Sequence, residues 1–140
     1  MKILLSRSNK IGSLLIRLVT WSRFSHVGIL TDDRKHVIEA LMFRGVVKTP
    51  LKEFIDRNDT VDEYEIQGSA EESEEYVGFG YDHLALIGIF LRNRNWHDPN
   101  KWFCSELVAF ISKMFNVRFM SRVTPQHILM VATFIKRLKG

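Results

Sequence analysis

The sequence predicts an α+β protein in which helices pack against a small, mostly antiparallel sheet. Its 140 residues suit one hydrophobic core, so we expect a single domain over 1–140. Apolar residues make up 46% and charged residues 26%, which is ordinary for a globular protein. Short strand-like runs, bounded by turn signals, occur together with longer runs whose apolar residues recur at helical spacing, and this mixture indicates the α+β class.

The first two elements are expected to be a strand over 1–7 and an amphipathic helix over 9–23. The apolar residues of this helix recur at helical spacing. They are Ile11, Leu14, Leu15, Leu18 and Val19. We expect this face to pack into the core; the alternative is a helix that lies on a membrane surface.

A β-hairpin is expected next, because two strand-like segments flank the polar turn "DDRK". Pro50 ends the segment that follows the hairpin. The expected elements are strands over 24–31, 36–41 and 45–50, a short helix over 51–57 and a strand over 61–67.

The second half of the chain is expected to be mainly helical, with N-caps at Ser69, Asp82 and Thr124 and a proline at the first helical position, Pro125. The tail could continue the last helix or form a strand, and we favour the strand. The expected elements are helices over 68–80, 82–93, 103–115 and 124–130, and a strand over 132–138.

Charge is unevenly distributed, with a net charge of +4 and a pI near 9.4. Residues 1–50 carry +6, residues 51–80 carry −8 and residues 81–140 carry +6. A basic protein can bind polyanions, but no tight run of basic residues occurs. We therefore favour a solvated surface and expect no specific nucleic-acid partner; weak contact with an anionic surface or a membrane is the alternative.

The cysteine and histidine content limits the chemistry. One cysteine excludes an internal disulfide and a multi-cysteine zinc site, and no two of the five histidines have zinc-motif spacing. We expect neither a metal nor a cofactor. The start of the chain does not match a secretory signal, and the longest apolar runs are too short to span a bilayer. The expected location is the cytoplasm, or a particle or medium into which the protein is released.

Cys104 lies in "KWFCSELVAF" and allows two interpretations. It begins an apolar stripe with Leu107, Val108 and Ile111, which is typical of a buried and inert cysteine. It also lies in the first turn of the expected helix, where unpaired backbone N–H groups and the helix dipole stabilise a thiolate. The helix alone favours the inert interpretation.

His26 is the histidine whose position is least ordinary, because it lies inside an expected strand close to Gly28. If the hairpin loop is Asp32–Asp33, then Thr31 pairs with Arg34 and His26 faces Glu39. We expect a four-residue loop to keep the same pairing, whereas a three-residue loop would put the two on opposite faces. The alternative is a solvent-facing Glu39 paired with a nearby Arg or Lys.

A helix-terminal cysteine, a strand histidine and a carboxylate on the neighbouring strand are the components of a papain-like site. The segments "FSHVGIL", "VIEAL…GVVKTPL", "GFGYD" and "WFCSELV" resemble the circularly permuted NlpC-like cysteine peptidases and amidases, the YiiX/YebB-like branch. The resemblance runs from about residue 24 to about residue 127, and "SHVGI" and "CSEL" are its most specific pieces. "VTP" near the end also fits.

The resemblance implies a permuted papain-like fold and hydrolysis or transfer of an amide or ester through a thioester on Cys104. His26 would be the base and Glu39 the orienting group. Tyr81 matches a family tyrosine near the active site and would contact substrate, or it is an aromatic at a strand-to-helix hinge. Ser25, beside the base, is a further candidate for substrate binding.

The expected function is therefore a cysteine hydrolase acting on a peptide or amide, with a cell-wall peptide as one candidate. A lipid acyltransferase or thioesterase of the same fold is one alternative. A non-catalytic binding or particle-structural domain is the other.

Overall fold

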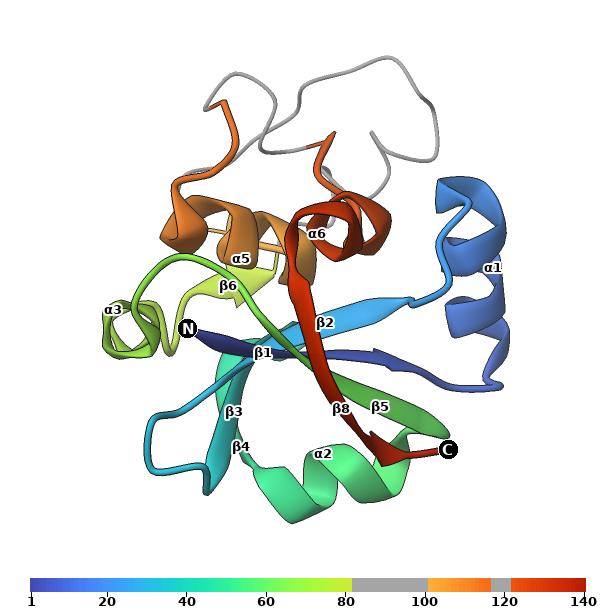
Figure 1. Ribbon diagram of the computed structural model, residues 1–140, viewed down its shortest axis with the longest axis horizontal. Helices are drawn as coiled ribbons and strands as arrows, with labels where there is room; N and C mark the ends of the chain where they lie inside the picture. The colour runs from blue at the N-terminus through green and yellow to red at the C-terminus, as the bar shows by residue number, and fades with distance from the viewer. Residues whose placement is uncertain (82–100, 117–121) are drawn as a thin grey trace.

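The computed structural model describes residues 1–81, 101–116 and 122–140, and its centre is a six-stranded sheet (Figure 1). Neighbouring strands are all antiparallel, in the order β4-β3-β2-β1-β5-β8. The strands are β1 (Lys2–Arg7), β2 (His26–Leu30), β3 (His36–Leu41), β4 (Gly45–Pro50), β5 (Thr60–Glu65) and β8 (Thr133–Lys139). This confirms the predicted α+β class, and it confirms the strand predicted for the tail.

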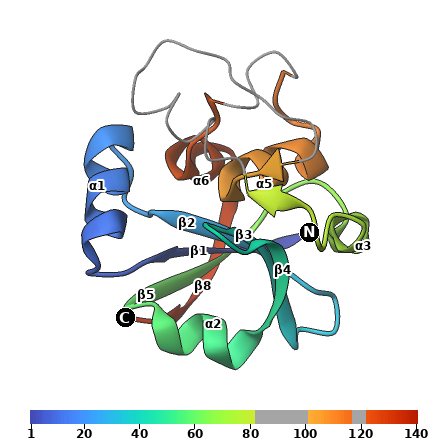
Figure 2. The same ribbon diagram turned by 180° about the vertical axis from the view of Figure 1, so that it is seen from behind.

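Helices cover both faces of this sheet, and Figures 1 and 2 show α5 and α6 on one side and α2 on the other. The helices are α1 (Ile11–Thr20), α2 (Leu51–Arg57), α3 (Ala70–Glu74), α5 (Cys104–Ser112) and α6 (Pro125–Val131). A separate two-stranded parallel sheet joins β6 (Gly80–Tyr81) to β7 (Lys101–Trp102). Within the three described ranges, no helix is long and apolar enough to cross a membrane.

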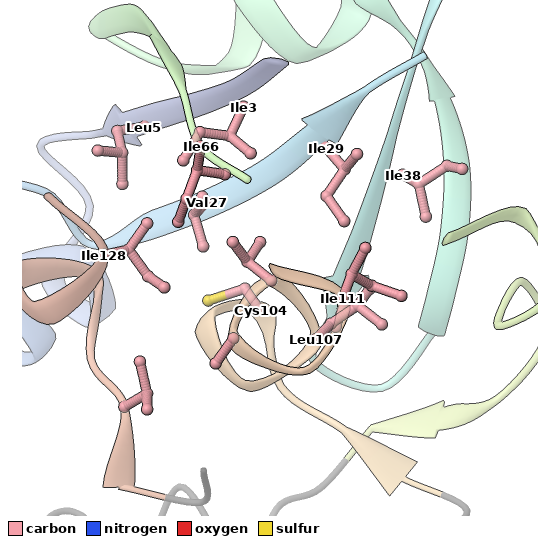
Figure 3. Close-up of a cluster of buried hydrophobic side chains, with 14 of the residues drawn as sticks. Ile3, Leu5, Val27, Ile29, Ile38, Ile66, Cys104, Leu107, Ile111 and Ile128 are labelled. Carbon is pink, nitrogen blue, oxygen red and sulfur yellow. The ribbon is translucent and has the colours of Figure 1, made fainter. Parts of the chain in front are cut away.

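The strand alternation divides the core into two parts. Ile3 and Leu5 of β1 point into the larger cluster beneath α5, together with Leu107 and Ile111 (Figure 3). Leu4, between them in sequence, points to the opposite face, where a smaller cluster lies under α2. Each face of the sheet therefore has its own apolar layer, and the face under α5 has the larger one.

The β2–β3 hairpin differs from the predicted register. Its residue pairs are Ile29 with Ile38 and Leu30 with Val37, and Thr31 donates its N–H to the His36 carbonyl. The loop thus contains the four residues 32–35, so the predicted pairings of Thr31 with Arg34 and of His26 with Glu39 are each wrong by two positions. A four-residue loop does not keep those pairings, contrary to our expectation. A shift of two residues preserves which face a side chain occupies, so the shared face of His26 and Glu39 survives the correction.

Helix α1 contradicts the expectation that its apolar face packs into the core. None of its residues is buried, and the outward side chains are apolar. Ile11 is 76% exposed, Leu18 71% and the following Trp21 81%. The helix lies beside the sheet and on neither of its faces (Figures 1 and 2).

The predicted caps have mixed outcomes. Ser69 is the N-cap residue of α3, but its side chain makes no capping hydrogen bond. Thr124 caps α6 with Pro125 at the start of the helix, and His127 completes a reciprocal capping box. The helix predicted over 82–93, with Asp82 as its cap, lies outside the described residues.

Candidate active site

Cys104 is the first residue of α5, and Phe103 is the N-cap. The helix begins here because Phe103 has an extended backbone and its carbonyl accepts the Leu107 N–H at 3.1 Å. Leu107 and Ile111 point into the core, whereas the Cys104 sulfur points away from Ile111, toward the side of Ile128 (Figure 3). The residue is 9% exposed, so the sulfur sits at the margin of the core.

Two backbone N–H groups, from Ser105 and Val27, donate hydrogen bonds to the Cys104 sulfur. The Ser105 donor belongs to the first turn of α5, where N–H groups lack helical partners. The Val27 donor comes from the sheet and needs a different explanation.

The Val27 N–H is available because β2 and β3 separate at this point. Thr31 donates its N–H toward β3, and strand alternation directs the Val27 N–H toward the same edge. The paired residues of the two strands end at Ile29 with Ile38, so the Val27 N–H lies beyond the ladder. The sulfur of Cys104 takes the place that a β3 carbonyl would occupy in a continued ladder.

His26 is the first residue of β2 and lies between the thiol and a carboxylate. Its Nε2 is 2.7 Å from Glu39 Oε2, and its ring also forms a hydrogen bond with Cys104. The ring centre lies 6.0 Å from that of Phe54 in α2, and the side chain is 18% exposed. Because Glu39 occupies Nε2, Nδ1 is the ring nitrogen left to exchange a proton with the thiol.

Glu39 is fully buried within β3 and has two cationic neighbours. Besides His26, the guanidinium of Arg57 donates a hydrogen bond to Glu39 Oε2. Arg57 is the last residue of α2, on the sheet face opposite α5. A buried carboxylate needs such partners to remain ionised, so Arg57 and His26 together hold Glu39 as an anion.

Gly28 explains how Glu39 reaches the histidine. Continuing the observed register places Glu39 opposite Gly28, on the diagonal from His26. A Cβ at Gly28 would lie 2.4 Å from Val37 Cγ1 and 3.4 Å from Glu39 Cβ. The glycine therefore admits the β3 side chains, as the sequence indicated for a close approach at this position.

The electrostatics of the site favour a thiolate–imidazolium pair. Burial alone would lower the pKa of His26, but the Cys104 thiolate and Glu39 outweigh it and raise that pKa to about 10. Burial would raise the pKa of Cys104, but the His26 charge and the two backbone donors lower it. Burial would likewise raise the pKa of Glu39, whereas His26 and Arg57 bring it to about 2.

The two predicted substrate-binding residues are placed differently. Ser25 is buried, its Oγ lies 2.6 Å from Ser13 Oγ of α1, and it also bonds the Ser6 carbonyl. This hydroxyl therefore links α1 to the strand that holds His26. The Tyr81 backbone pairs with Trp102 in the small parallel sheet, and its side chain lies outside the described residues.

Among the other histidines, His36 begins β3, and His127 accepts the Thr124 N–H through Nδ1 at 3.0 Å within the α6 cap. The sequence interpretation missed Arg57, which it placed in a short helix without a role. The available signal was the carboxylate inside an apolar strand, because such a group requires a cation nearby. Which cation serves depends on where α2 crosses the sheet, and local sequence does not contain that information.

The chain was compared with known protein families. Residues 3–136 match the model of the family described as "permuted papain-like amidase enzyme, YaeF/YiiX, C92 family". The chain belongs to this family. A search of curated proteins finds no match. Membership makes the protein a cysteine hydrolase of the permuted papain-like amidases, as the sequence resemblance predicted.

Among solved structures, this permuted papain-like amidase is similar to the crystal structure of metalloprotein yiiX from Escherichia coli O157:H7. The TM-score is 0.69 at 20% identity, and the match covers 99% of this chain and 97% of the other. The likeness confirms the fold. Within the described parts of the amidase, no three His, Cys, Asp or Glu side chains gather as metal ligands.

Proposed function

We propose that the protein hydrolyses an amide or peptide bond through a thioester on Cys104, with His26 as the base and Glu39 as the orienting group. The proposal rests on one observation, the continuous chain of contacts from the Cys104 sulfur through the His26 ring to Glu39. This is the order of nucleophile, base and orienting group in a cysteine hydrolase.

In the first half of the reaction, the Cys104 thiolate attacks the carbonyl carbon of the substrate, and the negative charge moves to the carbonyl oxygen. The Cys104 backbone N–H and a neighbouring donor would hold this oxyanion. The tetrahedral intermediate then breaks its C–N bond and forms the thioester, while His26 gives its proton to the leaving amine.

The high pKa of His26 is compatible with this proton transfer, because the neighbouring thiolate contributes to it. Acylation removes the negative charge from the sulfur, so the His26 pKa falls as the thioester forms. In the second half, His26 takes a proton from water, the hydroxide attacks the thioester carbonyl, and the acid product and the thiolate are released.

The substrate we propose is a peptide or amide, and a cell-wall peptide is the first candidate to test. Family membership supports the amide class, and Tyr81 and Ser25 stay our candidates for substrate contact. The buried position of Ser25 makes an indirect role, through its link to α1, the one that its contacts favour.

Acyl trapping tests the proposal. An activated ester is mixed with the protein, and its mass is measured after rapid acid quenching. We expect one acyl group per molecule, its removal by hydroxylamine as for a thioester, and no adduct on Cys104→Ala. An adduct that survives on Cys104→Ala, or a folded wild type that no activated ester or amide acylates, would contradict it.

A further inference from the structure

We propose that α1 docks the protein on the surface of an anionic lipid bilayer. The helix shows the reverse of the usual arrangement, in which the apolar face of a surface helix turns inward. The outward arc holds five apolar side chains, each at least 47% exposed. They are Ile11, Leu14, Leu15, Leu18 and Trp21.

Polar contacts hold the opposite side of the helix against the protein. Ser13 Oγ lies 2.6 Å from Ser25 Oγ and accepts the Ser8 N–H at 3.1 Å. The Thr20 hydroxyl, on the same side, is satisfied within α1 itself, because it donates to the Ile16 carbonyl at 2.7 Å. Because its polar side is engaged, the helix presents its apolar side outward as part of the folded structure.

The charges around α1 favour an anionic surface as the occupant. Residues 7–23, which include α1 and its two borders, contain four Lys or Arg and no Asp or Glu. Lys10 and Arg23, just before and after the helix, are exposed, and neither forms an ion pair within the described parts of the chain. Asp59 is a carboxylate close to the start of α1, where it accepts the Asn9 N–H.

The size of the helix fits a surface position. Its 10 residues extend about 15 Å, far less than the hydrocarbon core of a bilayer. A short amphipathic helix with Leu and Trp on one side and basic residues at its borders lies in the plane of the headgroups. The chain leads from α1 to His26 at the start of β2, so docking would bring the candidate active site to the membrane surface.

The test is co-sedimentation with vesicles made of equal parts phosphatidylcholine and phosphatidylglycerol. We expect wild type to pellet with these vesicles, less so at high salt and less with phosphatidylcholine alone. Leu14→Gln combined with Leu18→Gln should weaken binding on the order of tenfold or more, because both side chains would leave the acyl boundary. These residues are exposed, so the fold should survive.

Matched controls locate the contact. Phe43 is 85% exposed in the turn between β3 and β4, and Phe43→Gln should bind like wild type. Brominated lipids should quench the fluorescence of wild type but quench Trp21→Phe much less. Cys104→Ala should also bind like wild type, so a failure of catalysis and a failure of docking can be told apart.

Three results would overturn the proposal. The first is wild type that stays in the supernatant, and the second is an equal loss of binding in Phe43→Gln. The third is wild type that self-associates in solution and becomes monomeric in the double leucine variant, which would make a second copy of the chain the occupant of this face.

Discussion

Replacing Glu39 by Gln removes one negative charge from the centre of the proposed triad and keeps the size of the side chain. Glu39 Oε2 is 2.7 Å from His26 Nε2 and also accepts from Arg57. In the variant, the imidazolium loses its anionic partner and remains near the Arg57 cation. Both changes disfavour the charged ring, so the pKa of His26 should fall.

The size of this fall follows from the strength of the lost contact. A hydrogen bond to a charged group is worth roughly 1 kcal/mol more than a neutral one, and one pKa unit corresponds to about 1.36 kcal/mol. We therefore expect the His26 pKa to fall from about 10 by about one unit through the lost charge, and further through the Arg57 repulsion. Turnover should fall in part, and less than in Cys104→Ala.

The assay is an NMR titration of the His26 ring in wild type and Glu39→Gln. The midpoint of the His26 titration should move to lower pH in the variant. If the His26 titration is unchanged, Glu39 does not stabilise the imidazolium, and the assigned orienting group is wrong.

Three further predictions concern the supports of the triad. Arg57→Gln should raise the pKa of Glu39 and reduce turnover, whereas Arg57→Lys should keep a cation there, so that the Glu39 pKa and the turnover lie closer to the wild-type values. Equal activity in wild type, Arg57→Gln and Arg57→Lys would exclude Arg57 as a positioning residue. Gly28→Ala should lower the free energy of unfolding by about 1–3 kcal/mol through overpacking against Val37, and adding Val37→Ala should recover part of it in urea titrations. The pKa of Glu39 is lowered from 4.5 to about 2, against the effect of burial, so the ionised carboxylate should stabilise the folded protein. The advantage of wild type over Glu39→Gln in the free energy of unfolding should be fully present above pH 4.5 and should decline as the pH falls toward 2. A difference that stays constant over that range in urea titrations would contradict the ionised carboxylate.

The fold class and most elements could be predicted because their signals are local. Apolar periodicity located the helix that begins at Cys104, and the capping pattern of Thr124 and Pro125 located the last helix. The sequence could predict which face of the sheet each hairpin side chain occupies, but not which residues pair, because "DDRK" is compatible with loops of two or four residues. The predicted face was sufficient to place His26 and Glu39 on the same side.

Two features depend on how distant elements meet. The apolar period of α1 was recognised, but the direction of its apolar side was predicted wrongly, because the Ser13–Ser25 contact that orients the helix is tertiary. Arg57 was missed for a similar reason, since it reaches Glu39 only when α2 crosses the sheet behind β3. Both features depend on contacts between elements that are distant in the sequence, and the local pattern of either helix does not contain that information.

The rate of Cys104 alkylation as a function of pH tests the central claim most directly. A cysteine without a partner becomes reactive near its ordinary pKa of about 8.5, whereas the His26 charge and the Val27 and Ser105 donors lower the pKa of Cys104. We predict rapid modification of the folded protein by iodoacetamide near pH 6, and a profile that moves up by a pH unit or more in His26→Ala. A rate that rises only above pH 8 in wild type, or no labelling before denaturation, would show that Cys104 is an inert core residue.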